Sequence, residues 1–355
     1  MTDFCGAVDV GGTKIASALF TREGEISAGK KVAIDNAGGD AAASQVRDEI
    51  ATLAEAARRA GGRLAAVGVC VPGIVYSASG KVWAPNIPGW DQYPLFKKIG
   101  GLSPQGRQGA ASEKRPSELR RSDSEPQFWE ISELGVDKLT LVLESDRSAY
   151  VAGEAWKGAA AGARDAVFLA VGTGIGAGII SGGRILHGHE DIAGAVGWFG
   201  LDPDFKPEYA SMGCFEAEAS GNSVARKARE RLAKGRPSAM LDLAGGVIEA
   251  VTAEIVAAAA RRQDPPAKEV VADVVTYLAM GIANIVSILN PEVVVLGGGL
   301  FQAADLFLEP VRLEFKRWAQ PLAARSVRIE PSKLGEDAGL YGCGKLAWRT
   351  LEAES

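Results

Sequence analysis

Asp9-Val10-Gly11-Gly12-Thr13-Lys14 is the stretch that decides the fold of this 355-residue chain. An apolar strand predicted over residues 4–10 delivers an acidic residue and two glycines, and a second apolar strand is predicted over residues 14–20. Glycines let backbone N–H groups approach phosphate oxygens closely, and the threonine and lysine add a hydroxyl and a positive charge. Asp9 can hold Mg²⁺ through water. Taken alone, the stretch is also compatible with a plain hairpin turn.

Two further glycine turns follow predicted strands. Gly172-Thr173-Gly174 opens the run GTGIGAG after apolar residues 167–171, and Gly297-Gly298-Gly299 follows the apolar run VVVL. Each turn alone indicates no more than a hairpin or a tight strand-to-helix connection. The first two turns, one in each half of the chain, suit a triphosphate held between two lobes, with the third turn close to the nucleoside.

The hydrophobic pattern alternates strands with helices. Helices are predicted over 45–60, 145–157, 223–232, 239–262 and 268–289, and strands over 64–71, 138–143, 175–181, 184–186 and 291–296. This order predicts an α/β protein with two lobes. Residues 101–127 are rich in Ser, Arg, Glu, Pro and Gly, so we interpret them as a surface insertion, either a loop without a role or a flap at the cleft edge.

Composition excludes several functional classes. The net charge of −5 predicts no nucleic-acid partner, and the four scattered cysteines fit a reduced, cytoplasmic protein. No signal peptide is expected from the first residues. The apolar run 270–289 is long enough to cross a membrane. We interpret it as a buried core helix, because Asp273, Gly281 and Asn284 lie inside it, and we expect no membrane partner.

More motifs follow in order along the chain. They are Pro72-Gly73, Asn86-Ile87-Pro88-Gly89-Trp90, Gly213-Cys214-Phe215-Glu216 with Ser220-Gly221, Leu289-Asn290-Pro291-Glu292, and Leu334-Gly335-Glu336-Asp337-Ala338-Gly339. Together with the glycine turns, this set resembles the ROK family of sugar kinases and repressors over nearly the whole chain. The resemblance implies the actin-like ATPase fold, with two ribonuclease H-like lobes and an interlobe cleft.

The resemblance also implies lobe boundaries and ligands. The small lobe is expected to hold residues 1–142 and 335–355, and the large lobe residues 143–334. ATP, Mg²⁺, a sugar and a homodimer are implied. The expected nucleotide-binding residues are Asp9, Gly11, Gly12, Thr13, Lys14, Gly172, Thr173, Gly174, Gly297, Gly298 and Gly299.

The resemblance aligns Asp146 with the family's general base, which takes the proton of the attacking hydroxyl. The alternative is an N-cap aspartate that opens the helix after it. The sugar-binding residues that the resemblance implies, or that stand at its sugar motif, are Gly73, Asn86, Ser145, Trp198 and Glu216.

The chain departs from the family in two places. The family's E-x-G-H sugar motif reads Ala195-Val196-Gly197-Trp198, so both polar groups are gone. Trp198 either packs against a sugar or is an ordinary core tryptophan. The zinc motif C-x-C-G-x-x-G-C-x-E keeps only Gly213, Cys214 and Glu216, with Pro207 and Tyr209 near the other cysteine positions, so we expect no structural zinc.

The only histidines, His187 and His189, are two residues apart. They could form a weak metal site on a strand, but we expect a loop with two solvated side chains, because partner ligands are missing.

Two functions remain open at this point. The first is an ATP-dependent kinase that phosphorylates a hydroxyl of a hexose or modified hexose, and the second is a non-catalytic sugar or nucleotide sensor. A DNA-binding repressor is not expected, because the first motif starts at Asp9 and leaves no room for a helix-turn-helix before it. A Rossmann dehydrogenase is set aside because DVGGTKIASALF continues as a strand instead of opening a helix.

Overall fold

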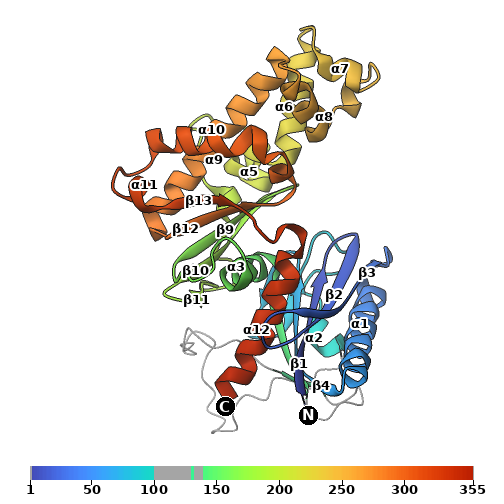
Figure 1. The fold of residues 1–355 in the computed structure, drawn as a ribbon. Helices are drawn as coiled ribbons and strands as arrows, with labels where there is room; N and C mark the ends of the chain where they lie inside the picture. The colour runs from blue at the N-terminus through green and yellow to red at the C-terminus, as the bar shows by residue number, and fades with distance from the viewer. Residues whose placement is uncertain (1, 100–128, 132–138, 355) are drawn as a thin grey trace. The chain divides into compact units, whose positions relative to one another are not determined.

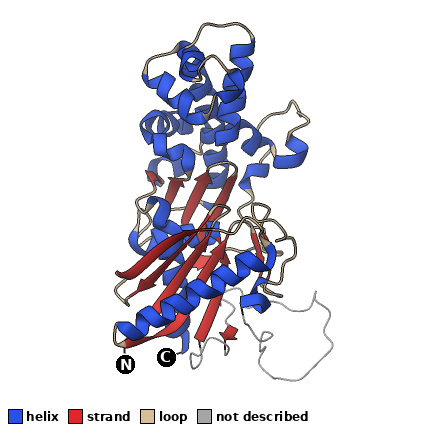
Figure 2. Ribbon diagram, turned by 90° about the vertical axis from the view of Figure 1, so that its right-hand side faces the viewer, coloured by secondary structure: helices blue, strands red, loops and turns tan. Residues whose placement is uncertain are grey.

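The protein forms two compact units, seen in a computed structural model that describes residues 2–99, 129–131 and 139–354 (Figure 1). The first unit holds residues 1–161, 184–192 and 337–355, and the second holds 162–183 and 193–336. The predicted insertion at 101–127 lies outside the described residues. Both units combine strands with helices (Figure 2).

The first unit is built on a mixed sheet with the strand order β3-β2-β1-β4-β8-β7. Its strands are β1 (Thr2–Val10), β2 (Lys14–Phe20), β3 (Ile26–Ala33), β4 (Gly62–Val71), β7 (Trp129–Ile131) and β8 (Leu139–Ser145). β1, β4 and β8 run parallel, in a register that pairs Asp9 with Cys70 and Cys70 with Glu144. Polar residues at the carboxyl ends of these three strands therefore meet at one edge of the sheet.

The alternation of β1 side chains explains how this sheet is covered. Val8 and Val10 share a core with α1 (Gly39–Arg59), whereas Cys5 and Ala7 belong to clusters that contain residues of α12 (Ala338–Glu354). Successive side chains of a strand point to opposite faces, so α1 and α12 cover the two faces. Figure 1 shows them in blue and red on either side of β1. Asp9 is in phase with Ala7 and faces α12.

The remaining elements of the first unit are short or lie beside α12. They are β5 (Ile74–Tyr76), β6 (Lys81–Trp83), α2 (Leu95–Ile99), α3 (Asp146–Lys157) and β11 (Arg184–Ile185). The sequence-based boundary at residue 143 differs from the contacts. Residues 143–161 stay with the first unit, because β8 pairs with β4 and α3 packs against α12.

The second unit packs helices on four adjacent strands in the order β10-β9-β12-β13, which belong to a five-stranded sheet with β11 next to β10. The strands are β9 (Ala166–Val171), β10 (Ile175–Ser181), β12 (Val293–Gly297) and β13 (Arg328–Pro331). The helices are α4 (Tyr209–Met212), α5 (Cys214–Ala219), α6 (Gly221–Ala233), α7 (Ala239–Leu243), α8 (Ala253–Arg261), α9 (Pro265–Leu289), α10 (Ala304–Trp318) and α11 (Ala323–Ser326). Short 3₁₀ turns cover Val196–Trp198, Ile248–Ala250, Gly299–Ala303 and, where the chain returns to the first unit, Gly335–Asp337.

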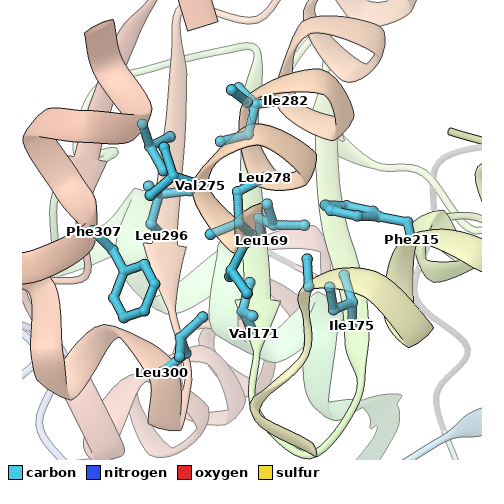
Figure 3. Packing of buried hydrophobic residues seen from close by; sticks show 14 of the residues in the cluster. Leu169, Val171, Ile175, Phe215, Val275, Leu278, Ile282, Leu296, Leu300 and Phe307 are labelled. Atoms are coloured by element: carbon cyan, nitrogen blue, oxygen red, sulfur yellow. The ribbon is translucent and has the colours of Figure 1, made fainter. Parts of the chain in front are cut away.

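The core of the second unit lies between α9 and the sheet. Leu278 and Ile282 of α9 lie over Leu169 of β9, with Phe215 of α5 beside them (Figure 3). α9 begins with Asp264 as N-cap, whose side chain accepts from the Ala267 amide, and ends at Asn290 in a left-handed conformation. Among the described residues, α9 is the helix long and apolar enough to cross a membrane, but half of its most apolar window is buried inside the protein.

One predicted element is wrong. The helix expected over 239–262 is broken into α7, a 3₁₀ turn and α8. Gly245 and Gly246 have φ values of 64° and 82°, which a continuing right-handed helix does not allow.

Candidate functional site

Asp146 begins α3 at the carboxyl end of β8, but it does not cap the helix. The cap is Ser145, whose hydroxyl accepts from the Ser148 amide at 3.3 Å and donates to the Ser148 hydroxyl at 3.0 Å. The capping alternative for Asp146 is therefore wrong, and its carboxyl is left for another role. The hydroxyl of Ser145, predicted to contact sugar, is engaged inside the protein.

The pKa of Asp146 is raised from 3.8 to about 6. Removal from water is the main cause, and the neighbouring Asp9 carboxylate adds to it. The Arg147 guanidinium opposes the shift, as do the backbone amides of Arg147 and Gly73. The Arg147 amide donates to Oδ1 of Asp146 at 2.7 Å. A carboxyl in this state is deprotonated at neutral pH and can still accept a proton readily.

Asp9 lies between β4 and the start of α12. The Cys70 thiol donates to its Oδ1 at 3.2 Å, and a Cβ built at Gly339 would lie 2.3 Å from its Oδ2. Burial raises the pKa of Asp9, and Cys70, Lys14 and Lys31 oppose that shift. Sequence reasoning missed Cys70. Asp9 and Cys70 both lie near the carboxyl ends of predicted strands, and the parallel register of β1 and β4 pairs Cys70 with Asp9. Aligning the ends of these two strands could have identified Cys70.

The first glycine turn is tight and touches the predicted sugar loop. The Gly11 amide donates to the Lys14 carbonyl at 2.8 Å, which closes the turn between β1 and β2. A Cβ on Gly12 would lie 3.1 Å from the Cβ of Asn86. Asn86 itself is exposed, in a loop closed by the Ala84 amide donating to the Trp90 carbonyl at 2.8 Å. The first unit thus brings the predicted phosphate turn and sugar residue together.

Gly73 follows β4 and must be glycine. Its φ is 119°, and a Cβ there would lie 2.1 Å from the Trp83 carbonyl oxygen. Only glycine adopts this conformation easily, so the chain can turn here and present the Gly73 amide to Asp146.

The two glycine turns of the second unit meet at one end of its sheet. The Gly172 amide donates to the Gly174 carbonyl at 2.9 Å, and the Gly221 amide, at the start of α6, donates to the Gly172 carbonyl at 2.8 Å. A Cβ on Gly172 would lie 3.8 Å from the Gly299 nitrogen. Gly298 has a φ of 90° and presses against the Val171 carbonyl. Thr173, Gly298 and Gly299 are exposed, so their backbone groups can meet a ligand.

Glu216 on α5 faces the turn at residues 172–174. Its Oε2 accepts from the Ile175 amide at 2.7 Å, and a Cβ at Gly174 would lie 2.7 Å from the same oxygen. Burial raises the pKa of Glu216, and the Ile175 amide opposes this shift. The carboxylate is therefore held in one orientation beside the glycine turn.

Trp198 is 58% exposed, so the interpretation as an ordinary core tryptophan is wrong. Its backbone is constrained, because a Cβ at Gly213 would lie 2.6 Å from the Trp198 Cα. The adjacent Gly197 packs against Glu216, since a Cβ built at Gly197 would lie 3.2 Å from the Cβ of Glu216. The indole therefore projects from the segment that also supports Glu216.

The cysteines and histidines that could have bound a metal make other contacts in this structure. All four cysteines are free and buried, and the Cys214 sulfur accepts from the Leu201 amide at 3.4 Å. Among the described residues, no group of three or more His, Cys, Asp or Glu side chains could hold a metal ion. His189 is exposed as expected, but the expectation of a solvated His187 is wrong, because its Nε2 lies 2.7 Å from Oε2 of Glu144.

The donors present in the first unit fit a magnesium–phosphate group. Mg²⁺ in nucleotide sites is held by one or two carboxylates together with phosphate oxygens and water, not by a cage of protein ligands. Asp9 supplies a carboxylate whose desolvation a cation would relieve, and the exposed end of the Gly11–Gly12 turn follows it closely in the sequence.

Comparison with known proteins gives consistent results. The sequence profile described as "ROK family" matches residues 5–102 and 136–350. A glucokinase of Halalkalibacterium halodurans is 31% identical over 343 residues, which is 96% of this chain and 93% of that protein. The structure of a ROK family glucokinase from Streptomyces griseus, in complex with glucose and AMPPNP, aligns with a TM-score of 0.71 at 28% identity, covering 98% of this chain and 99% of that one. The DNA-binding transcriptional repressor Mlc of Escherichia coli is 27% identical over 201 residues, 56% of this chain and 48% of the repressor.

Proposed function

Because the chain belongs to the ROK family and has its actin-like ATPase fold, we propose that it is an ATP-dependent sugar kinase. The kinase transfers the γ-phosphoryl group to a hydroxyl of a hexose or modified hexose. A cytoplasmic location and a homodimer are part of the proposal. The location rests on the four scattered cysteines, and the homodimer rests on the family resemblance.

The observation that carries the proposal is the Asp146 carboxyl. It lies at the carboxyl end of the first unit's sheet, it is released from helix capping by Ser145, and the Gly73 amide supports it. In the proposed reaction Asp146 takes the proton from the sugar hydroxyl as that oxygen bonds to the γ-phosphorus, and the bond from phosphorus to the β-phosphate oxygen breaks to release ADP. The raised pKa supports this role.

The glycine turns bind the nucleotide in this proposal. The phosphates lie against the turns Gly11–Gly12 and Gly172–Thr173–Gly174, with the amides of Gly12 and Thr173, the Thr13 hydroxyl and the Lys14 ammonium beside them. The amides of Gly11 and Gly172 close the two turns by donating to the carbonyls of Lys14 and Gly174. Gly297, Gly298 and Gly299 lie against the nucleoside. The hydrogen bonds of Gly11 and Gly172 fix the backbone of both turns in advance, which suits electrostatic stabilisation of the transferred group.

Asp9 would hold Mg²⁺ through water, and when bound the ion neutralises charge on the phosphates. The chain's own contribution is to fix the Asp9 carboxylate. The Cys70 thiol holds one oxygen, and the close approach of Gly339 limits the position of the other.

In this proposal the sugar is recognised by Asn86, Gly73 and Ser145 of the first unit and by Glu216 and Trp198 of the second. The amide of Asn86 and the carboxylate of Glu216 offer hydrogen bonds to hydroxyls, and the exposed indole of Trp198 offers a flat apolar surface. Ala195 offers no polar group, so fewer charged contacts hold the sugar than the family motif implies.

The test is ADP release from ATP and Mg²⁺ by the purified protein, across hexoses and N-acetylhexosamines. We expect turnover with one sugar, and Asp146→Asn should lower kcat by about 10²–10⁴-fold. The control is Asp48→Asn, an exposed aspartate on α1, which should keep full activity. In the wild type, kcat should fall below about pH 6, as Asp146 becomes protonated.

The second candidate is a non-catalytic sugar or nucleotide sensor. It is favoured by the loss of both polar groups at Ala195 and Trp198, and the family includes repressors such as Mlc. Sugar or nucleotide binding by calorimetry without turnover on any sugar would establish the sensor and reject the kinase.

A further inference from the structure

Glu218 on α5 is a buried carboxylate that accepts hydrogen bonds from three side chains. Glu218 has a side chain only 1% exposed, and its oxygens accept from Lys206 Nζ, Tyr209 Oη and Lys227 Nζ, each at 2.5 Å. We name these four residues the Glu218 cluster. A buried carboxylate needs such partners, because an unpaired charge in the protein interior costs several kcal/mol.

Asp202 extends the Glu218 cluster. Its Oδ2 accepts from Tyr277 at 3.1 Å, and it lies 3.3 Å from the Tyr209 hydroxyl oxygen and 3.3 Å from Lys206 Nζ. The Lys227 ammonium also lies over the Tyr277 ring, 5.0 Å from its centroid. The contacts therefore join the segment 201–209 to α5, α6 and α9, which also pack on one another.

The charges in this group balance, with two carboxylates against two ammonium groups. The pKa of Glu218 is lowered although burial raises it, because Lys206, Lys227 and Tyr209 together outweigh the loss of water. The pKa of Lys206 is raised by Glu218 and Asp202, against the effect of burial. The ion pairs of Glu218 with Lys206 and Lys227, and of Asp202 with Lys206, therefore act as an ionic cross-link.

The cross-link is one of the contacts that orient α5, another being the packing of Phe215 on α9. The helix has only six residues, too few to be stable by itself. Glu216 and Glu218 are two residues apart, so at about 100° per residue their side chains leave opposite sides of the helix. Glu216 binds the Ile175 amide on one side, and Glu218 binds the two lysines on the other.

The cross-linked segment also borders Trp198. Residues 201–213 begin where the Leu201 amide donates to the Cys214 sulfur and end at Gly213, which packs against the Trp198 backbone. Tyr209 stands near a position where the family's zinc motif has a cysteine. In this chain its hydroxyl is bound by Glu218 and Asp202 instead.

We propose that the Glu218 cluster is a positioning device that holds Glu216 and Trp198 in the orientation that binds the sugar. This inference rests on the proposed sugar kinase function. Glu218 touches neither the sugar nor the nucleotide in this scheme. It acts through α5 and through the segment 201–213.

The experiment compares Glu218→Gln and Tyr209→Phe with the wild type. Glu218→Gln removes the charge that binds both lysines, while Tyr209→Phe removes one hydroxyl and keeps the ring. Glu230→Gln is the matched control, because Glu230 forms an exposed ion pair with Arg226 on α6. Steady-state constants for sugar and ATP are measured for each, and hydrogen exchange is followed by mass spectrometry on peptides from residues 199–213.

For Glu218→Gln we expect a rise in the sugar KM of about tenfold, with kcat and the ATP KM changed less than about threefold. Tyr209→Phe should show the same pattern at a smaller size. Exchange at 199–213 should speed up in both variants and stay unchanged in Glu230→Gln.

A folded Glu218→Gln or Tyr209→Phe with wild-type sugar KM and wild-type exchange at 199–213 would overturn the inference. An equal loss of sugar and ATP affinity, with lower thermal stability, would also overturn it, because that is the result of general destabilisation. A wild type that neither binds nor phosphorylates any sugar is a separate result. It rejects the proposed function, and the positioning role is rejected with it.

Discussion

The buried carboxyl group of Asp146 lowers the stability of the folded protein at neutral pH, and its proposed role as a base explains why such a group is present. Its pKa is higher in the folded chain than the ordinary 3.8, so the folded state binds the proton more tightly than the unfolded state. The stability that this group contributes is therefore greatest below about pH 4 and is lost as the pH rises through about 6. At neutral pH the charged carboxylate destabilises the first unit.

We therefore expect Asp146→Asn to unfold at a higher temperature than the wild type at pH 7.5, without nucleotide or Mg²⁺. A shift from 3.8 to about 6 corresponds to at most about 3 kcal/mol of unfolding free energy. Calorimetry at pH 7.5 and pH 4 measures it, and the difference should nearly vanish at pH 4. An Asn variant that is less stable than the wild type at pH 7.5 would contradict this account.

At the residue scale, the sequence predicted which residues carry the chemistry but not how each is held. Asp146 was assigned through the family resemblance, since a helix-capping aspartate has the same local sequence. The side chain that caps α3 proved to be Ser145. Cys70 beside Asp9 and Glu144 beside His187 come from distant parts of the chain, and no local pattern marks such pairs.

At the scale of elements, Gly281 tests the packing of α9, because replacing this glycine has two opposing effects on stability. Alanine normally stabilises a helix relative to glycine by about 1 kcal/mol. At Gly281, however, a Cβ would lie 2.4 Å from the ring of Phe215, which is fully buried. Gly281→Ala should therefore destabilise the protein by about 1–3 kcal/mol.

Asn284→Ala is the control on the same helix, because Asn284 is exposed and alanine should stabilise it by about 0.5 kcal/mol. Urea unfolding of both variants measures the two free energies. If Gly281→Ala stabilised the protein as Asn284→Ala does, the close packing of α5 on α9 would be wrong.

At the element scale, buried and strongly periodic segments were predicted best. The strand at 175–181 agrees with β10, and the helix at 268–289 lies inside α9. The strand β3 was missed, because most of its side chains are exposed and no apolar alternation marks it. The break between α7 and α8 was also missed, although the pair Gly245-Gly246 stood inside the predicted helix.

On the scale of the whole molecule, the end of the chain completes the first unit. Residues of α12 pack on the sheet and on α3, with Leu346 in a buried cluster beside Val142 and Ala152. Leu346→Ala should lower the free energy of unfolding by about 2–5 kcal/mol. Urea denaturation provides the measurement.

Glu352→Ala on the same helix is the comparison. Glu352 is exposed and pairs with Lys345 at 3.5 Å, so its loss should change stability by less than about 1 kcal/mol. Equal effects of the two variants would show that α12 contributes little to this core. The sequence predicted that the C-terminal segment returns to the first unit, but only through the family resemblance, because no local pattern shows where a helix docks.

The division of the chain into interleaved segments has a consequence for its synthesis. The second unit ends at residue 336, whereas the first unit needs residues 337–355, which are translated after it. Domains usually fold in the order in which they are translated. Here the order is reversed, because every residue of the second unit emerges before the first unit is complete. Until residues 337–355 emerge, the nascent chain exposes the face of β1 and β4 that α12 later covers, and this face is where a ribosome-associated chaperone would bind.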